Sequence, residues 1–190
     1  KYFTDYFKGI PFGSRQPFYY YMRQAILGGF AGGLILNSWL FYLENDLNGT
    51  REQVSTYMSL IAIGYIFPMV IPSLFRFRRK RMPVYAAIIP SLSIIPLLFF
   101  IKNNWIWLIV AAMIQAVPRI GSAATVAIFK ANYPATVRGH IFARCQFWAT
   151  GAQVITTLAI GYLFGKDAAK YFKPSIAVYL LLNIVSIYFF

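Results

Sequence analysis

Polar side chains recur at helical spacing inside two of the most apolar stretches of the sequence. They fall at i, i+4 and i+7 in the first stretch and at i, i+4, i+7 and i+11 in the second: Gln115, Arg119 and Ser122, then Gln146, Thr150, Gln153 and Thr157. This spacing places each set along one stripe of a helix. Amides, hydroxyls and a guanidinium on such stripes can bind a polar or anionic solute, or they can hydrogen-bond a neighbouring helix.

Arg119 is the most informative of these residues, because it is a permanent charge near the middle of an apolar segment. An arginine at that depth of a bilayer costs about 2.5 kcal/mol or more on insertion scales. Its expected partners are backbone carbonyls, Gln115, Gln146 or Gln153, a bound anion, or protein outside these 190 residues. We therefore predict a substrate cavity, with interhelical hydrogen bonding as the alternative, lined by Asn37, Gln115, Arg119, Gln146, Thr150 and Gln153.

The elements that must position these residues are membrane-spanning helices. The chain is 59% hydrophobic and 12% charged, whereas soluble domains carry about 25% charged residues. Apolar runs of roughly 18 or more residues, enough to cross a hydrocarbon core of ~30 Å, recur along it. The sequence predicts an all-α membrane protein in which a cytoplasmic or interfacial segment, 1–23, precedes a six-transmembrane-helix bundle, 24–190. The predicted spans are 24–43, 54–75, 83–101, 105–130, 141–164 and 175–190.

The distribution of basic residues predicts the orientation of this bundle. With the N-terminus in the cytoplasm, twelve of the eighteen basic residues fall on the cytoplasmic side: Lys1, Lys8, Arg15, Arg23, Arg76, Arg78, Arg79, Lys80, Arg81, Lys130, Arg138 and Arg144. Cytoplasmic loops carry such an excess, so both termini are expected in the cytoplasm. The net charge of +13 then reflects topology, and nucleic acid is not an expected partner.

Small residues indicate where helices pack closely. Gly28, Gly29, Gly32 and Gly33 give two overlapping GxxxG spacings in the first predicted span. Such pairs let two helix backbones approach each other in a membrane. We therefore expect the first span to make a close helix contact.

Three stretches resemble the N-terminal six-helix half of a major facilitator superfamily transporter. "RQAILGGFAGGLILNSWLFYL" resembles the first span of bacterial members, "PSLFRFRRKRMPVY" lies where the family has its basic loop, and "PRIGSAATVAIFKANYPATVRGHIFAR" resembles the run from span four into span five. The acid of the loop motif falls at Phe75 here. The resemblance implies a bacterial inner-membrane location and a cytoplasmic gate or lipid contact formed by Arg76, Arg79, Lys80, Arg81 and Arg138.

The same resemblance implies alternating access around a midplane site, with a second six-helix half supplying the other wall. We expect a carrier of a small solute, or part of one, in which Arg119 binds an anionic group or tunes the cavity. The alternative is a non-transporting structural or assembly subunit of a larger membrane complex. An enzyme is not expected, because the single histidine, His140, and the single cysteine, Cys145, form no nucleophile–base or metal-binding pattern. No pattern predicts a cofactor or a metal.

Overall fold

The protein is helical throughout the part of the chain that is described. The structure, a computed structural model, describes residues 10–45, 47–64, 66, 89, 92–117 and 122–188, without the side chains of residues 36, 37, 99, 122–124, 168, 169, 187 and 188. Its principal elements are the 3₁₀ turn η1 (Phe12–Ser14), α2 (Arg15–Asn45), α3 (Arg51–Gly64), the 3₁₀ turn η2 (Ile95–Phe99), α6 (Asn104–Ala116), α7 (Ser122–Asn132), α8 (Ala135–Phe164) and α9 (Ala168–Tyr188).

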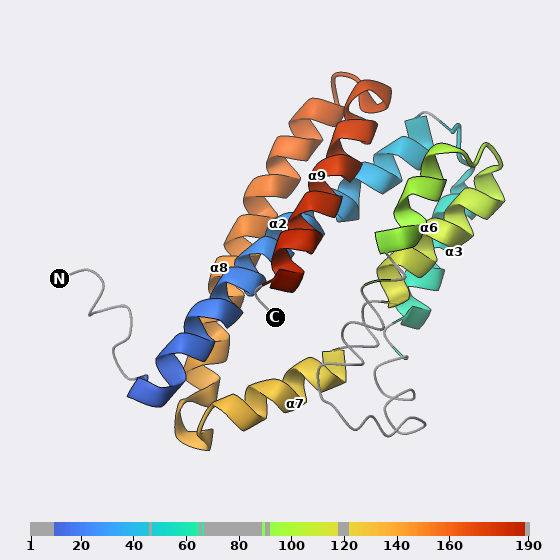
Figure 1. Cartoon of the computed structure of the whole chain (residues 1–190). Helices are drawn as coiled ribbons and strands as arrows, with labels where there is room; N and C mark the ends of the chain where they lie inside the picture. The colour runs from blue at the N-terminus through green and yellow to red at the C-terminus, as the bar shows by residue number, and fades with distance from the viewer. Residues whose placement is uncertain are drawn as a thin grey trace.

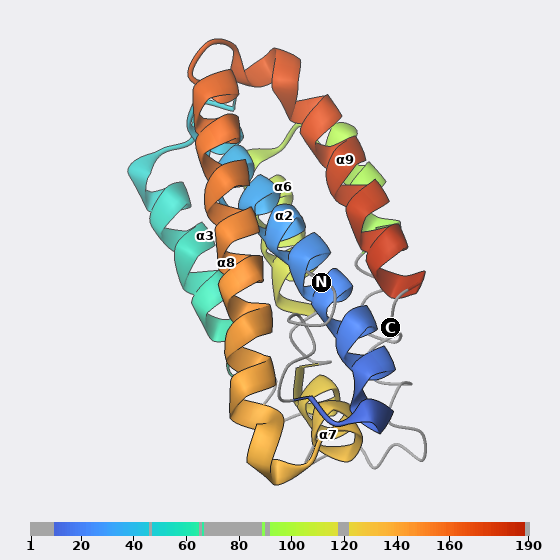
Figure 2. The ribbon, with the colours of Figure 1, turned by 90° about the vertical axis from the view of Figure 1, so that its left-hand side faces the viewer.

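Helix α2 is the centre of the packing. It contacts α8 and α9 along much of its length, while α3 packs against α6. The start of α2 and the turn between α7 and α8 lie at one end of the molecule, and the α8–α9 turn lies at the other (Figures 1 and 2). Helix α7 runs at a steep angle to α6 and reaches back toward the start of α2.

Local side-chain signals set the start of several helices. Thr50 and Gln53 form a reciprocal capping box before α3: the Gln53 N–H donates to the threonine hydroxyl at 3.3 Å, and the Thr50 N–H donates to the glutamine carbonyl at 3.0 Å. The Asn103 side chain accepts from the N–H groups of Trp105 and Ile106 at the start of α6. These bonds satisfy donors that the first helical turn leaves without partners.

The helices agree with the predicted spans in part. Helix α2 begins at Arg15 rather than at residue 24, and Pro17 lies in its first turn, where proline is tolerated. Helices α8 and α9 also begin earlier than expected, at Ala135 and Ala168. The predicted span 105–130 is occupied by two helices, α6 and α7. The spans 54–75 and 83–101 lie partly outside the described residues.

Two helical stretches are long and apolar enough to cross a membrane. They are Phe12–Asn45, of 34 residues, and Ala135–Phe164, of 30 residues; Asn104–Ala116 is apolar but shorter. Each stretch has a most apolar window of 18 residues. In the first stretch 50% of this window is buried inside the protein, and in the second only 22% is buried. Helix α8 therefore presents most of its apolar surface outward.

The main core is aromatic and lies toward the end where α2 finishes. Trp39 and Trp107 are fully buried in it, with ring centroids 6.2 Å apart. Tyr42 stacks on Phe172 of α9, with centroids 3.6 Å apart and rings within 5° of parallel. These rings join α2, α6 and α9 into one packed unit. A smaller cluster at the other end joins the start of α2 to α7 and α8 through Phe18, Tyr133, Ile141 and Cys145.

Two of the four glycines in α2 make its contact with α8. A Cβ added to Gly29 would collide with the backbone carbonyl of Ala149, and one added to Gly33 would lie 2.6 Å from the backbone oxygen of Gln153. A Cβ on Gly28 would meet nothing within 4 Å. The expected close helix contact is confirmed, with Gly29 and Gly33 as the GxxxG pair that forms it.

The substitutions Gly29→Ala and Gly28→Ala are expected to change stability in opposite directions. At Gly29 the methyl group forces the two backbones apart, at a cost of about 1–3 kcal/mol. At Gly28 it only raises helix propensity, which stabilises by about 0.5–1 kcal/mol. Thermal unfolding of the purified chain in detergent measures both, and an equal effect of the two substitutions would contradict the contact.

Candidate functional site

The structure describes some of the residues predicted to line a cavity or gate. Several lie outside the described residues: Arg119 of the cavity, the side chain of Asn37, and Arg76, Arg79, Lys80 and Arg81 of the basic loop. The remaining residues are Gln115 on α6, Gln146, Thr150 and Gln153 on α8, and Arg138 at the start of α8.

Gln115 joins two helices. Its amide nitrogen donates a short hydrogen bond to the hydroxyl of Tyr57 on α3. Tyr57 is fully buried in the main core, and Gln115 is half-buried. A polar pair in an apolar setting is stable only when both partners are satisfied. In the described part of the chain, Gln115 therefore acts as an interhelical contact between α3 and α6.

Gln146 and Thr150 lie on the outward face of α8. Both side chains are exposed, and the Gln146 amide nitrogen is 3.4 Å from the Thr150 hydroxyl, to which it donates. They line a shallow surface hollow together with apolar neighbours one turn away, including Phe147 and Ile155. Gln146 and Thr150 are therefore two polar side chains surrounded by a largely apolar surface.

Gln153 continues the same stripe but meets α2. It is half-buried, and its side-chain amide carbon lies 4.0 Å from the position that a Cβ would take on Gly32. Its backbone carbonyl makes the close approach to Gly33. The polar stripe of α8 therefore runs along the border between the α2 contact and the outward apolar face.

The structure does not bring the amides of α6 and α8 into one site. Helices α6 and α8 lie on opposite sides of α2 (Figure 1), and Gln115 and Gln146 have different surroundings. The polar stripe on α8 and the pair on α3 and α6 are two separate features.

Arg138 closes the turn between α7 and α8. Its Nε donates to the carbonyl of Tyr133 at 2.7 Å, and its Nη2 donates to the carbonyl of Lys130 at 2.7 Å. These carbonyls belong to the end of α7, where backbone acceptors lack helical partners and a positive charge is favourable. The contacts that the structure shows for Arg138 are therefore structural.

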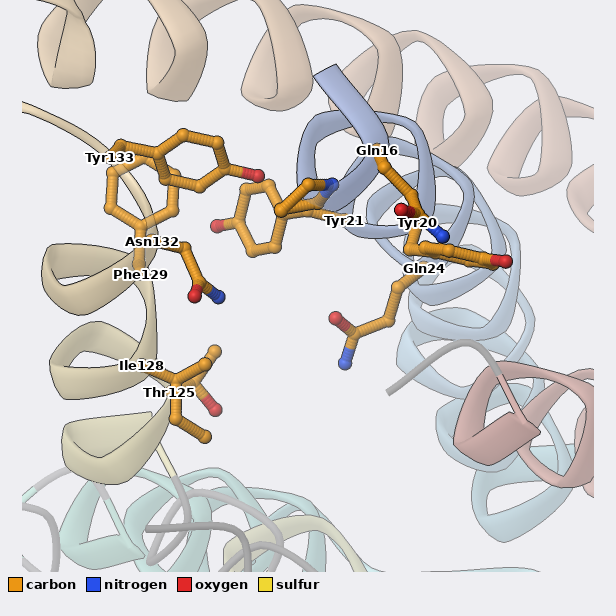
Figure 3. Close-up of a pocket in the computed structure, with 10 residues that line it drawn as sticks. Gln16, Tyr20, Tyr21, Gln24, Thr125, Ile128, Phe129, Asn132 and Tyr133 are labelled. Carbon is orange, nitrogen blue, oxygen red and sulfur yellow. The ribbon is translucent and has the colours of Figure 1, made fainter. Parts of the chain in front are cut away.

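A cleft that the sequence reasoning missed lies between the start of α2 and α7. This α2–α7 cleft has a volume of about 280 Å³ and is lined by Gln16, Pro17, Tyr20, Tyr21, Gln24, Thr125, Ile128, Phe129, Asn132 and Tyr133 (Figure 3). Gln16, Tyr20 and Gln24 follow each other at i, i+4 and i+8. That spacing indicates a polar stripe on one side of a helix. However, the aromatic residues 18–21 are equally typical of a segment at a membrane surface.

The substitutions Tyr57→Phe and Gln115→Met are expected to be coupled. Either one leaves the other polar group without its partner, so the double mutant loses less than the sum of the two, by about 0.5–1.5 kcal/mol. Thermal unfolding of the four proteins measures this coupling. The matched control pairs Gln115→Met with Tyr162→Phe on the exposed face of α8, where additive effects are expected.

The substitution Arg138→Gln is expected to destabilise the chain by about 1–3 kcal/mol, because it exposes two helix-end carbonyls without a donor. Lys130→Gln is the control, since it removes a nearby positive charge but keeps the backbone carbonyl that Arg138 binds. Denaturant unfolding separates the two cases. Equal losses would show that charge, and not the two hydrogen bonds, matters here.

Comparison with known proteins identifies no relative. No family model matches the chain, and neither a curated protein nor a solved structure matches it.

Proposed function

We propose that the chain is an integral membrane protein that forms one half of an alternating-access carrier for a small solute, similar to the six-helix half of a major facilitator transporter. The observation that carries the proposal is the polar pair Gln146–Thr150 on the outward apolar face of α8. The two side chains hydrogen-bond each other, but both are exposed, and a polar or wet environment would suit them better than lipid.

The outward face of α8 favours a membrane location. Phe147, Leu158 and Tyr162 are 72%, 69% and 66% exposed, respectively. A soluble monomer seldom carries a continuous apolar surface of this kind, whereas a bilayer covers it without cost. The lengths of the two long apolar helices are also compatible with a hydrocarbon core of ~30 Å.

The polar pair Gln146–Thr150 indicates that lipid does not cover the whole outward face of α8, and that protein or water covers part of it. Amides and hydroxyls within a membrane are costly against lipid, and they usually face protein or a water-filled cavity. Gln146 and Thr150 border the contact between α8 and α2, so water or a solute that reached them would lie beside the central helix. A second six-helix unit facing α8 would enclose that space.

The charges favour the orientation proposed here, with both termini in the cytoplasm of a bacterial inner membrane. The described basic residues divide evenly between the two ends: Arg15, Arg23, Lys130, Arg138 and Arg144 lie where α2 and α8 begin, and Arg51, Lys102, Lys166, Lys170 and Lys173 lie at the opposite end. The described acids Glu44, Glu52 and Asp167 lie at the opposite end. The excess that the positive-inside rule requires comes from the whole sequence, in which twelve of the eighteen basic residues fall on the proposed cytoplasmic side.

The proposed solute is small and anionic. Arg119 would supply the positive charge, with Asn37 and the α8 stripe as further polar contacts. No coupling through an acidic group is proposed, because the predicted spans contain no Asp or Glu.

A second candidate is a non-transporting structural subunit of a membrane complex. The observation that favours it is that Gln115 and Arg138 both bond within the chain, as packing residues do. In that case the apolar face of α8 would be a protein interface, and Gln146 and Thr150 would hydrogen-bond a partner chain.

The two candidates predict different accessibilities on α8. In a Cys145→Ala background, which removes the single cysteine of the chain, Thr150→Cys and Leu158→Cys place one thiol each on the outward face. In a carrier, water reaches position 150. The thiol introduced by Thr150→Cys should then react with a hydrophilic maleimide about tenfold faster in native membranes than the thiol introduced by Leu158→Cys, because the reactive thiolate requires water.

The other outcomes separate the alternatives. Slow reaction at both positions, with Thr150→Cys cross-linking to another polypeptide, would support the structural subunit. Slow reaction at both positions without any cross-link would mean that lipid covers the whole face and would contradict the carrier proposal.

A further inference from the structure

The α2–α7 cleft has the composition of a binding site. Its walls come from two helices that are distant in the sequence. The side chains of Gln24 and Asn132 project into the space between them, and Thr125 lies on the α7 wall (Figure 3). Pro17, Ile128 and Phe129 supply apolar surface beside these polar groups. Seven of the ten lining residues carry a polar side-chain group, so the cleft suits a polar ligand with a small apolar part.

Tyr133 at the edge of this cleft carries a polar group without a partner. Its side chain is 3% exposed, and its hydroxyl makes no hydrogen bond with the described residues. The hydroxyl points toward α2, and the hydroxyl of Tyr21 points back toward α7 (Figure 3). Burial raises the pKa of Tyr133 above its ordinary value, and the neighbouring Cys145 and Tyr21 raise it further. The hydroxyl therefore stays protonated and can donate.

The electrostatic setting of the cleft favours a negative ligand. Gln16 and Pro17 belong to the first turn of α2, the positive end of a 31-residue helix. Arg23 lies seven residues after Gln16, on the same side of α2, and its guanidinium stacks on the ring of Tyr19, 3.9 Å from the centroid, so it adds positive charge near the cleft without lining it. Arg138 covers the carbonyls at the end of α7 that would otherwise repel an anion. None of the described acids lies at this end of the molecule.

We propose that the α2–α7 cleft binds a phosphate monoester or diester, held by Tyr133, Gln24 and Asn132 as hydrogen-bond donors. The source is either the headgroup of a phospholipid at the cytoplasmic surface or a soluble phosphate ester. The apolar wall formed by Ile128 and Phe129 would contact the carbon atoms next to the phosphate in either one. Solute transport is not required for this site, and only the lipid source depends on the proposed membrane location.

The test measures two probes on the full chain. Glycerol 3-phosphate is titrated by calorimetry into delipidated protein in detergent. Retention of phosphatidylglycerol is compared by native mass spectrometry with retention of a phosphate-free galactolipid of the same acyl chains. We expect binding of at least one phosphate probe in preference to the galactolipid. Glycerol 3-phosphate binding identifies a soluble ester, and phosphatidylglycerol retention alone identifies a lipid headgroup.

Tyr133→Phe is the decisive variant, because it removes one oxygen and preserves the shape of the ring. We expect phosphate binding to weaken about tenfold, while the thermal stability of the ligand-free chain is unchanged or higher, since the hydroxyl lacks a partner there. Tyr162→Phe on the exposed face of α8 is the matched control and should bind as the unaltered chain does. Gln24→Leu is a second variant with the same expected loss.

Three results would overturn the proposal. They are failure of both phosphate probes to bind, retention of the galactolipid equal to that of phosphatidylglycerol, and unchanged phosphate binding in both Tyr133→Phe and Gln24→Leu. The readouts contain no transport step, so failure of this site and failure of the carrier proposal are separate results.

Discussion

The close contact between α2 and α8 is the constraint on which the other features depend. Gly29 and Gly33 bring the two backbones together, because a side chain at either position would occupy the space of an Ala149 or Gln153 carbonyl. Within a membrane, helices gain little from hydrophobic burial against each other, so close packing of this kind provides much of the attraction. Helix α2 also packs on α9, so its position against α8 sets that of α9 as well.

The narrow contact also explains why the polar stripe lies where it does. Because glycine has no side chain, the glycine face of α2 is narrow. It covers only one side of α8 and leaves the neighbouring α8 residues uncovered. Gln153 is partly covered by α2, whereas Gln146 and Thr150 are exposed at the border. A site at this border would have one rigid wall, formed by the α2–α8 pair, and a second wall from whatever faces α8. Alternating access requires a rigid unit of this kind that moves against another.

The sequence alone predicted the helical class, the long apolar helices and the glycine contact, since each depends on local composition and spacing. It did not predict what each stripe faces. Periodicity shows that Gln115 lies on a polar stripe, but its partner Tyr57 is 58 positions away. Arg138 resembled a gate residue, yet the described contacts are helix-end carbonyls, which no residue type marks in a sequence.

The polar groups of the described chain fall into two classes with different consequences. Gln115, Tyr57 and Arg138 are satisfied inside the chain, so replacing them changes stability before it changes any function. Among the described residues, the Tyr133 hydroxyl and the Trp107 indole N–H have no such bond, and of the two only Tyr133 lines the α2–α7 cleft. A buried polar group without a partner costs about 1–3 kcal/mol, and a phenylalanine would fill the same space without that cost. The Tyr133 hydroxyl is therefore unfavourable for the fold alone and would become favourable if a ligand in the α2–α7 cleft accepted a hydrogen bond from it. At Tyr133 the requirements of stability and of the proposed phosphate site therefore conflict, as they often do at functional residues.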